Sequence, residues 1–173
     1  MTLASTEAGK PITFDAGDGS IIIEGVASRI GPELRVAELP DDLAALVTSR
    51  RDLGNGWTWT TIGGTVLDGN PCTLSLGAFQ GFLAEVSWSV RTAGAGYAGG
   101  WPSPDAVAKE VDLVSQILTR VFGPGQLPSR GAGEPTRYGK DFPWGRVWCE
   151  LDPRAGTCAS GLCYTTPQPP RSA

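Results

Sequence analysis

Residues 82–91 are FLAEVSWSVR, and they give the clearest strand pattern in the chain. One set of alternating side chains is apolar: Phe82, Ala84, Val86, Trp88 and Val90. The residues between them are mainly polar: Glu85, Ser87, Ser89 and Arg91. Because successive side chains of a strand point to opposite faces of a sheet, the stretch predicts a β-strand with one buried face and one wet face.

Two further strands are predicted just before it. Residues 72–79 (CTLSLGAF) alternate in the same way, and residues 56–66 (GWTWTTIGGTV) have β-branched and aromatic side chains on both sides of the predicted strand. Short turn signals, LDGNP at 67–71 and AFQG at 78–81, separate the three segments. An antiparallel meander is therefore expected, and residues 11–25 (PITFDAGDGSIIIEG) predict another strand, turn and strand.

Residues 104–122 predict one long helix, with Ser103 as its cap, Pro104 in its first turn, and Gly123 and Pro124 at its end. Its apolar residues recur at helical spacing, so we expect it to cover the sheet face that carries Phe82, Val86 and Trp88. A short helix is also expected within residues 40–54 (PDDLAALVTSRRDLG). A long loop should then run over 124–141.

The chain ends with a predicted hairpin that pairs residues 146–151 with 157–165 across the turn DPRAG. Three of the four cysteines lie in it, but their spacing does not match a zinc site and no histidine is present, so we expect no metal. Cys149 and Cys158 flank the turn, and the strand register would decide whether they are close enough for a bridge.

These elements predict an α+β fold: a mainly antiparallel meander, one covering helix and a C-terminal hairpin. A length of 173 residues fits a single domain spanning 1–173. The ends, residues 1–10 and 167–173, are small or polar and are expected to be flexible.

Composition excludes several functions. Without histidine, a Ser-His-Asp triad, a Cys-His pair and a histidine base are impossible. A net charge of −4 without any basic run argues against nucleic-acid binding. No apolar stretch is long enough to cross a membrane, and the first residues lack a signal-peptide pattern, so a cytoplasmic protein is expected.

Carboxylate chemistry stays open at this point. Glu85 and Glu150 would meet on an open sheet face if their strands were neighbours, although their alternation favours two separate solvated side chains. We expect no cofactor.

The tryptophans divide into two groups. Trp59 and Trp88 lie on alternating strands and are expected in the core. Aromatic residues in Gly- and Pro-rich segments at the two ends of the long helix are candidate partner-binding residues, and the loops that carry them would converge on one sheet edge. The predicted partner-binding set is Tyr97, Trp101, Tyr138, Asp141 and Trp144. The alternative is that the aromatics cover the edge of the sheet.

Four stretches carry a resemblance to a loose group of small bacterial α+β proteins: GWTWTTIGG (56–64), FQGFLAEVSWSV (79–90), VFGPG (121–125) and WGRVWCELDPRAGTCASGLCY (144–164). The resemblance covers about residues 20–166. Some proteins of this group resemble immunity proteins encoded beside polymorphic toxins, so it implies a protein that binds and blocks a cognate toxin. It implies no catalytic residues.

The sequence thus predicts a non-catalytic protein-binding module of immunity type. An acidic inhibitor would suit a basic toxin, because complementary charge speeds encounter. Two alternatives remain: a carboxylate-using enzyme or a binder of sugars or other small ligands, and a structural subunit of a phage or secretion assembly. Oligomeric state is not predicted.

Overall fold

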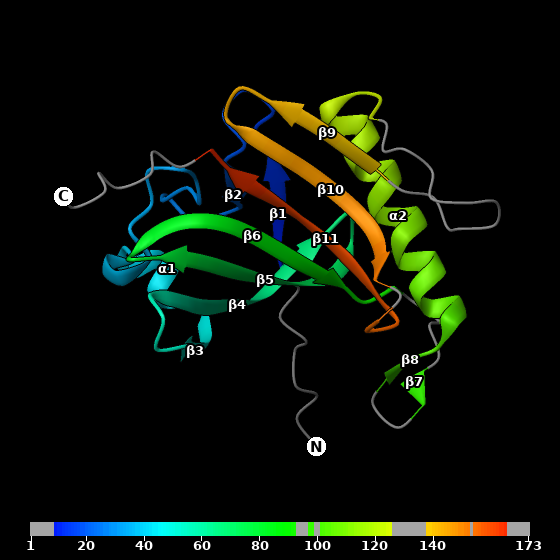
Figure 1. Ribbon diagram of the computed structural model, residues 1–173, viewed down its shortest axis with the longest axis horizontal. Helices are drawn as coiled ribbons and strands as arrows, with labels where there is room; N and C mark the ends of the chain where they lie inside the picture. The colour runs from blue at the N-terminus through cyan, green and yellow to red at the C-terminus, as the bar shows by residue number, and fades with distance from the viewer. Residues whose placement is uncertain (1–8, 93–96, 99–100, 126–137, 153, 166–173) are drawn as a thin grey trace, which may run out of the picture.

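The computed structural model describes residues 9–92, 97–98, 101–125, 138–152 and 154–165. In this part of the chain, nine strands form one curled, mainly antiparallel sheet with one long helix, α2, against it (Figure 1). The predicted α+β fold is confirmed. The sheet contains β1 (Lys10–Phe14), β2 (Ile21–Ile23), β3 (Val47–Asp52), β4 (Trp57–Leu67), β5 (Asn70–Phe79), β6 (Phe82–Val90), β9 (Tyr138–Phe142), β10 (Gly145–Asp152) and β11 (Thr157–Tyr164). The other elements are a 3₁₀ turn (Val36–Glu38), α1 (Asp41–Ala44), α2 (Pro104–Phe122), and the paired β7 (Tyr97–Ala98) and β8 (Trp101–Pro102).

The strand order is β2-β1-β4-β5-β6-β11-β10-β9, with β3 also paired to β4. The predicted meander of β4, β5 and β6 is confirmed, and its turns carry two successive residues with positive φ, Asp68-Gly69 and Gln80-Gly81. Positive φ at both central residues is the geometry of a tight two-residue hairpin. The parallel pairing of β1 with β4 was not predicted.

The C-terminal hairpin is also confirmed, with β10 and β11 paired from Gly145↔Tyr164 to Asp152↔Thr157. The carboxylate of Asp152 accepts hydrogen bonds from the Arg154 and Ala155 backbone N–H groups, and Gly156 has a φ of 63°. The predicted loop over 124–141 is wrong at its end, because Tyr138 already starts β9 and pairs with Cys149. Residues 126–137 lie outside the described part of the chain, as do 1–8 and 166–173, which include most of the predicted flexible ends.

The predicted helix within 40–54 is mostly wrong. Only Asp41–Ala44 is helical, while Val47–Asp52 forms β3 against β4. Local charge placement favoured a helix, but Val47 and Thr48 are β-branched, and pairing with β4 satisfies the backbone hydrogen bonds of this segment.

Helix α2 has the predicted bounds. The Ser103 hydroxyl accepts a hydrogen bond from the Ala106 N–H at 3.2 Å, and Gly123 ends the helix with a φ of 78°. The helix lies against β9, β10 and β11 rather than mainly over β6 (Figure 1). It reaches the end of β6 through Glu110, whose carboxylate accepts a 2.8 Å hydrogen bond from the Val90 N–H. Burial raises the pKa of this carboxyl.

The face of the sheet that α2 covers, here called the inner face, holds the core. The core contains Ile12, Ile62, Leu74, Leu76, Val86, Trp88, Val147, Cys149 and Leu162 from the strands and Val107, Val111, Val114 and Leu118 from α2. Phe14 links Trp88 and Phe122, with ring centroids 5.1 and 5.7 Å away. Trp88 is 3% exposed, so its predicted core position is confirmed.

Phe82 does not share this face, contrary to the prediction. The pairing of β5 with β6 shifts between Gly77 and Ala78, so that Leu83 and Val86 are both buried although they are three residues apart. A bulge of this kind inserts an extra residue and reverses the alternation beyond it. Phe82 is therefore 42% exposed on the opposite face of the sheet.

All four cysteines are free thiols. The Sγ atoms of Cys149 and Cys158 are 3.8 Å apart and unbridged. No group of three or more Cys, Asp or Glu residues that could hold a metal ion is found in the described segments. No described helix is both long enough and apolar enough to span a membrane.

Replacing Val114 with Asp tests the docking of α2. Val114 has no exposed surface, so an unpaired charge there should lower the free energy of unfolding by about 3 kcal/mol or more. Urea unfolding followed by circular dichroism measures this, and Gln116→Asp on the exposed side of the same helix is the control, with a cost below about 1 kcal/mol. Equal midpoints for Val114→Asp and the parent would mean that the helix is not docked as described.

Candidate functional site

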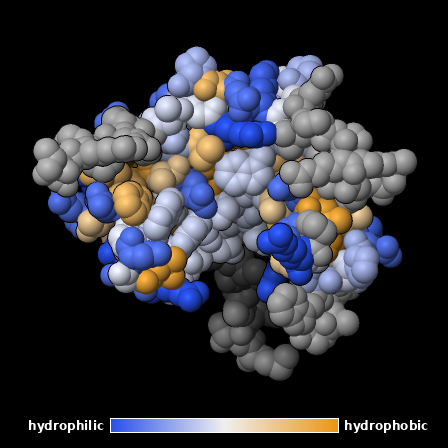
Figure 2. Space-filling model, viewed as in Figure 1, coloured by the Kyte–Doolittle hydropathy of each residue, from blue (hydrophilic) through white to orange (hydrophobic). Residues whose placement is uncertain are grey.

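The second face of the sheet, here called the outer face, is the candidate site. Strand register aligns its residues in rows that cross the sheet. One row is Arg51, Trp59, Gly77, Glu85, Cys163, Arg146 and Asp141; the next is Ser49, Thr61, Ser75, Ser87, Gly161, Trp148 and Gly139. Apart from the glycines, the residues of both rows are half-buried or exposed. The middle of Figure 2, over β6 and β11, is accordingly mostly pale, the colour of intermediate hydropathy.

Two tryptophans of this face lie over glycines of the neighbouring strand. A Cβ built on Gly77 would lie 3.0 Å from Cη2 of Trp59, and a Cβ built on Gly161 would lie 2.9 Å from Cζ2 of Trp148. Any residue other than glycine at position 77 or 161 would therefore place its Cβ where the indole ring lies. Since Gly77 is on β5 and Gly161 on β11, with β6 between them, the two glycines are separated by about 10 Å across the sheet.

Glu85 lies between the two tryptophans, on β6. Its Cγ is 2.8 Å from the same Cβ position above Gly77, so its side chain is next to the ring of Trp59. The described residues give its carboxylate no hydrogen bond or ion pair, and partial burial raises its pKa. The charge of Glu85 is thus partly desolvated without compensation, which is costly in a fold.

Glu150 is not a neighbour of Glu85. Glu85 pairs with Cys163 on β11, whereas Glu150 pairs with Ala159, four residues further along the same strand. Four residues of strand span about 13 Å. A paired-carboxylate site formed by these two residues is therefore not present.

An aromatic row lies at one end of the outer face and consists of Trp57, Phe79 and Phe82, with Leu53 beside it. Trp57 pairs with Phe79 and Phe79 with Phe82, and the Leu53 N–H donates to the Trp57 carbonyl. Phe82 and Leu53 are each 42% exposed, and they are the exposed large apolar residues of the described chain. The guanidinium carbon of Arg35 lies 3.7 Å from the centroid of Phe82.

A groove of about 970 Å³ lies at the other end of the outer face. Thr73 and Ser89, which pair across β5 and β6, belong to both the face and the groove. Pro11, Val66 and Pro71 supply its apolar lining. The outer face thus has an aromatic end, a centre with small polar residues such as Ser75 and Ser87, and a groove at its other end.

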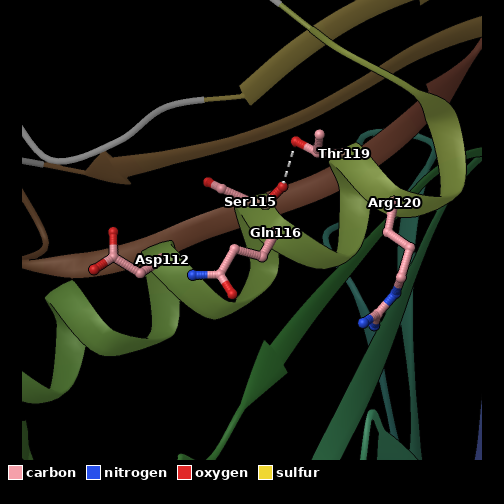
Figure 3. Close-up of a pocket in the computed structure, with 5 residues that line it drawn as sticks. All are labelled: Asp112, Ser115, Gln116, Thr119 and Arg120. Atoms are coloured by element: carbon pink, nitrogen blue, oxygen red, sulfur yellow. Dashed lines mark hydrogen bonds between the residues drawn. The ribbon is translucent and has the colours of Figure 1, made fainter.

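A smaller hollow of about 330 Å³ lies along α2 (Figure 3). The described residues that line it, Asp112, Ser115, Gln116, Thr119 and Arg120, all come from this helix. The Thr119 hydroxyl donates to the Ser115 carbonyl at 2.8 Å, and Arg120 forms an ion pair with Asp68 at 3.1 Å. Side chains of one helix do not converge on a ligand from several directions, so this hollow is a weaker candidate than the outer face.

The sequence-predicted partner-binding residues do not form one patch. Tyr97 and Trp101 are in the β7–β8 pair at the start of α2, while Tyr138 reaches the other end of the helix, where its hydroxyl donates to the Gly123 carbonyl at 3.0 Å (Figure 1). A helix of 19 residues is about 28 Å long, which separates the two groups. The expected convergence on one sheet edge is wrong for them.

The sequence-predicted residues also differ in exposure. The side chain of Asp141 is 84% exposed on the outer face, with Oδ1 3.5 Å from Nε of Arg146. Tyr138 is only 2% exposed, so its side chain belongs to the hydrophobic core. The side chains of Tyr97 and Trp101 are outside the description, and a partner-binding role for the set stays a prediction.

Trp144, in the turn between β9 and β10, closes the curled sheet. Its ring stacks on Phe142 at 4.8 Å, and its Nε1 donates to the Ala16 carbonyl at 3.1 Å. Gly19 lies under the ring, with a φ of 76° and no room for a Cβ. The hydroxyl of Tyr164 donates to the Gly19 carbonyl at 3.0 Å, so one turn between β1 and β2 is held by two aromatics from the C-terminal hairpins.

Sequence reasoning missed Trp59 and Trp148 as surface residues, and the core position expected for Trp59 is wrong because its ring is half-buried on the outer face. By alternation, Trp59 lies on the same side of its strand as Thr61, and Trp148 on the same side as Glu150. The buried partners of these strands, Thr60 and Ile62 on β4 and Val147 and Cys149 on β10, show which parity is inside. On β10 the solvated position expected for Glu150 already implied this parity. On β4 aromatic and β-branched residues occur on both sides, so only the pairing with β5 decided which side is buried.

In the described part of the chain, the fold is an α+β arrangement with one sheet face covered by α2 and a second face that no described long helix covers. No family model and no curated protein sequence matches the chain. Among solved structures, a chain in the structure titled "Rhs1-CT in complex with cognate immunity protein RhsI1" is similar, with 15% identity, a TM-score of 0.44, and coverage of 89% of this chain and 87% of that one. A likeness of this size is too distant to carry an argument about function.

Replacing Trp144 with Ala tests whether this residue belongs to the fold or to a partner surface. Loss of its contacts with Phe142 and Gly19 should lower the free energy of unfolding by about 3 kcal/mol. Trp144→Phe keeps an aromatic ring and loses only the indole hydrogen bond, so its cost should be about 1 kcal/mol. Both are measured by urea unfolding. An unchanged midpoint for Trp144→Ala would return Trp144 to the candidate partner-binding residues.

Proposed function

We propose that this protein is a non-catalytic binding module that attaches to a partner protein through the outer face of its sheet. The observation that carries the proposal is that both exposed large apolar residues of the described chain, Leu53 and Phe82, lie at this face beside Trp57 and Phe79. Exposed apolar clusters rimmed by polar residues are typical of protein interaction sites.

The composition of the face supports the same function. Aromatic residues are enriched at the centres of protein interfaces, and Trp59 on β4 and Trp148 on β10 add aromatic area to the same face in neighbouring rows. Small polar residues between them, Ser75 and Ser87, allow a partner's backbone or side chains to approach closely. Asp141 belongs to the rim of this surface.

We further propose that the partner is a cognate toxin that this protein blocks, as an immunity protein does. Support for this comes from the resemblance of residues 20–166 to such proteins and from the acidic net charge of −4, which would speed encounter with a basic toxin. Tyr97 and Trp101, near the start of α2, remain proposed contacts at a second place. A cytoplasmic location suits this function.

The outer-face proposal is tested by two truncations on different strands of the face, one on β6 and one on β10. With a toxin encoded beside the gene as partner, Phe82→Ala and Trp148→Ala should each weaken binding by about 2 kcal/mol, or about 30-fold, in isothermal titration calorimetry. Gln116→Ala on the exposed side of α2 is the matched control and should bind like the parent. Parent-like affinity for both outer-face variants would reject the outer face as the binding surface.

Modification of Cys163 provides a second, independent test. This thiol is half-buried in the middle of the outer face, whereas Cys72 and Cys149 are buried, and burial raises the pKa of Cys72 to about 12. N-ethylmaleimide should therefore react with native Cys163 before these two, as mass spectrometry will show. The modified protein should lose partner binding, whereas a Cys163→Ser variant treated identically should keep it. Full binding by protein modified at Cys163 would contradict the proposal.

A sugar-binding face is the second candidate function. Trp59 and Trp148 lie over glycines with serine hydroxyls between them, which suits a ligand with both flat apolar faces and hydroxyl groups. Oligosaccharide titrations that shift the indole signals of both tryptophans, together with no toxin binding, would favour this alternative.

A further inference from the structure

We infer that Trp59 and Glu85 together form a site for an arginine side chain of the partner, an inference that rests on the proposed function. The two residues pair across Gly77 in one row of the outer face. Both approach the same point: Glu85 Cγ lies 2.8 Å and Trp59 Cη2 3.0 Å from the position that a Cβ on Gly77 would take. A carboxylate and an aromatic ring are thus adjacent on an accessible surface.

Glu85 carries a partly buried charge that has no partner among the described residues. Its carboxylate is partly removed from water, yet no described residue pairs with it or donates a hydrogen bond to it. A desolvated charge without a partner destabilises the free protein, and a cation delivered by a partner would remove that cost. Charge complementarity therefore indicates a positively charged group at this position.

The protein's own arginines in this row do not supply that cation. Arg146 lies on β10, beyond Cys163 of β11, and its Nε is 3.5 Å from Asp141. Arg51 pairs with Trp59 on the side away from Glu85. The described neighbours of Glu85 in the row are Gly77 and Cys163, neither of which is positively charged.

Arginine fits the site better than lysine. A guanidinium group is planar, stacks on aromatic rings and donates two parallel hydrogen bonds to a carboxylate, whereas an ammonium group is compact and more strongly hydrated. The ring of Trp59 has no aromatic neighbour among the described residues, so stacking by an incoming group displaces no ring already in place.

The test uses the isolated protein and N-acetyl-arginine amide as the probe. In ¹⁵N–¹H spectra, the indole signal of Trp59, assigned through a Trp59→Phe variant, should shift in a saturable way, and the signal of buried Trp88 should not. Glu85→Gln should weaken this binding at least fivefold. N-acetyl-lysine amide should bind more weakly than the arginine probe, and neutral N-acetyl-glutamine amide should cause no saturable shift.

Two outcomes would overturn the inference: no saturable shift of Trp59 with the arginine probe, or equal binding by the parent and Glu85→Gln. Thermal unfolding of Glu85→Gln is the second readout. Because the charge is unpaired in the free protein, this variant should melt at or above the parent temperature, while a structural role for the carboxylate would lower it. These results do not depend on Phe82→Ala or Trp148→Ala, so failure of the arginine site and failure of the outer-face proposal can be distinguished.

Discussion

One long helix can cover only one face of a sheet, and the organisation of this protein follows from the face that α2 covers. Its buried stripe, which includes Val107, Val111, Val114 and Leu118, packs on the inner face formed with β9, β10 and β11. The buried residues of β4, β5, β6, β10 and β11 alternate toward this inner face, so each strand must present its other side chains to the opposite face. The described chain has no second long helix to cover those residues.

The curl of the sheet is held where its distant strands meet. Trp144 and Tyr164, from the C-terminal hairpins, contact the turn between β1 and β2 through the Ala16 and Gly19 carbonyls. Gly19 is required there because its φ is positive and the indole of Trp144 occupies the place of a side chain. This closure fixes the inner core and uses one of the aromatics that the sequence had suggested for partner binding.

On the outer face, glycine has a different role. Gly77 and Gly161 have no side chain, so Trp59 and Trp148 lie over the neighbouring strands. The result is a surface with broad aromatic area, small hydroxyl residues and one half-buried carboxylate at Glu85. An uncompensated, partly buried charge lowers the stability of a free protein. Such a charge and an exposed aromatic cluster are both expected where a partner completes the surface.

The sequence by itself determined the local elements. Alternation set the three strands of the meander, the Asp-Gly and Gln-Gly pairs set their turns, and Ser103, Pro104 and Gly123 set the bounds of α2, because each signal acts through residues close in the chain. Tertiary structure alone decided that Val47–Asp52 is a strand, since its partner β4 supplies the hydrogen bonds. It also decided that Phe82 points outward, through a bulge that depends on pairing with β5. Trp59, Gly77 and Glu85 are neighbours only because of the register between β4, β5 and β6, and Tyr138 is buried by contacts with the end of α2. Both features depend on residues far apart in the chain, so local sequence patterns did not predict them.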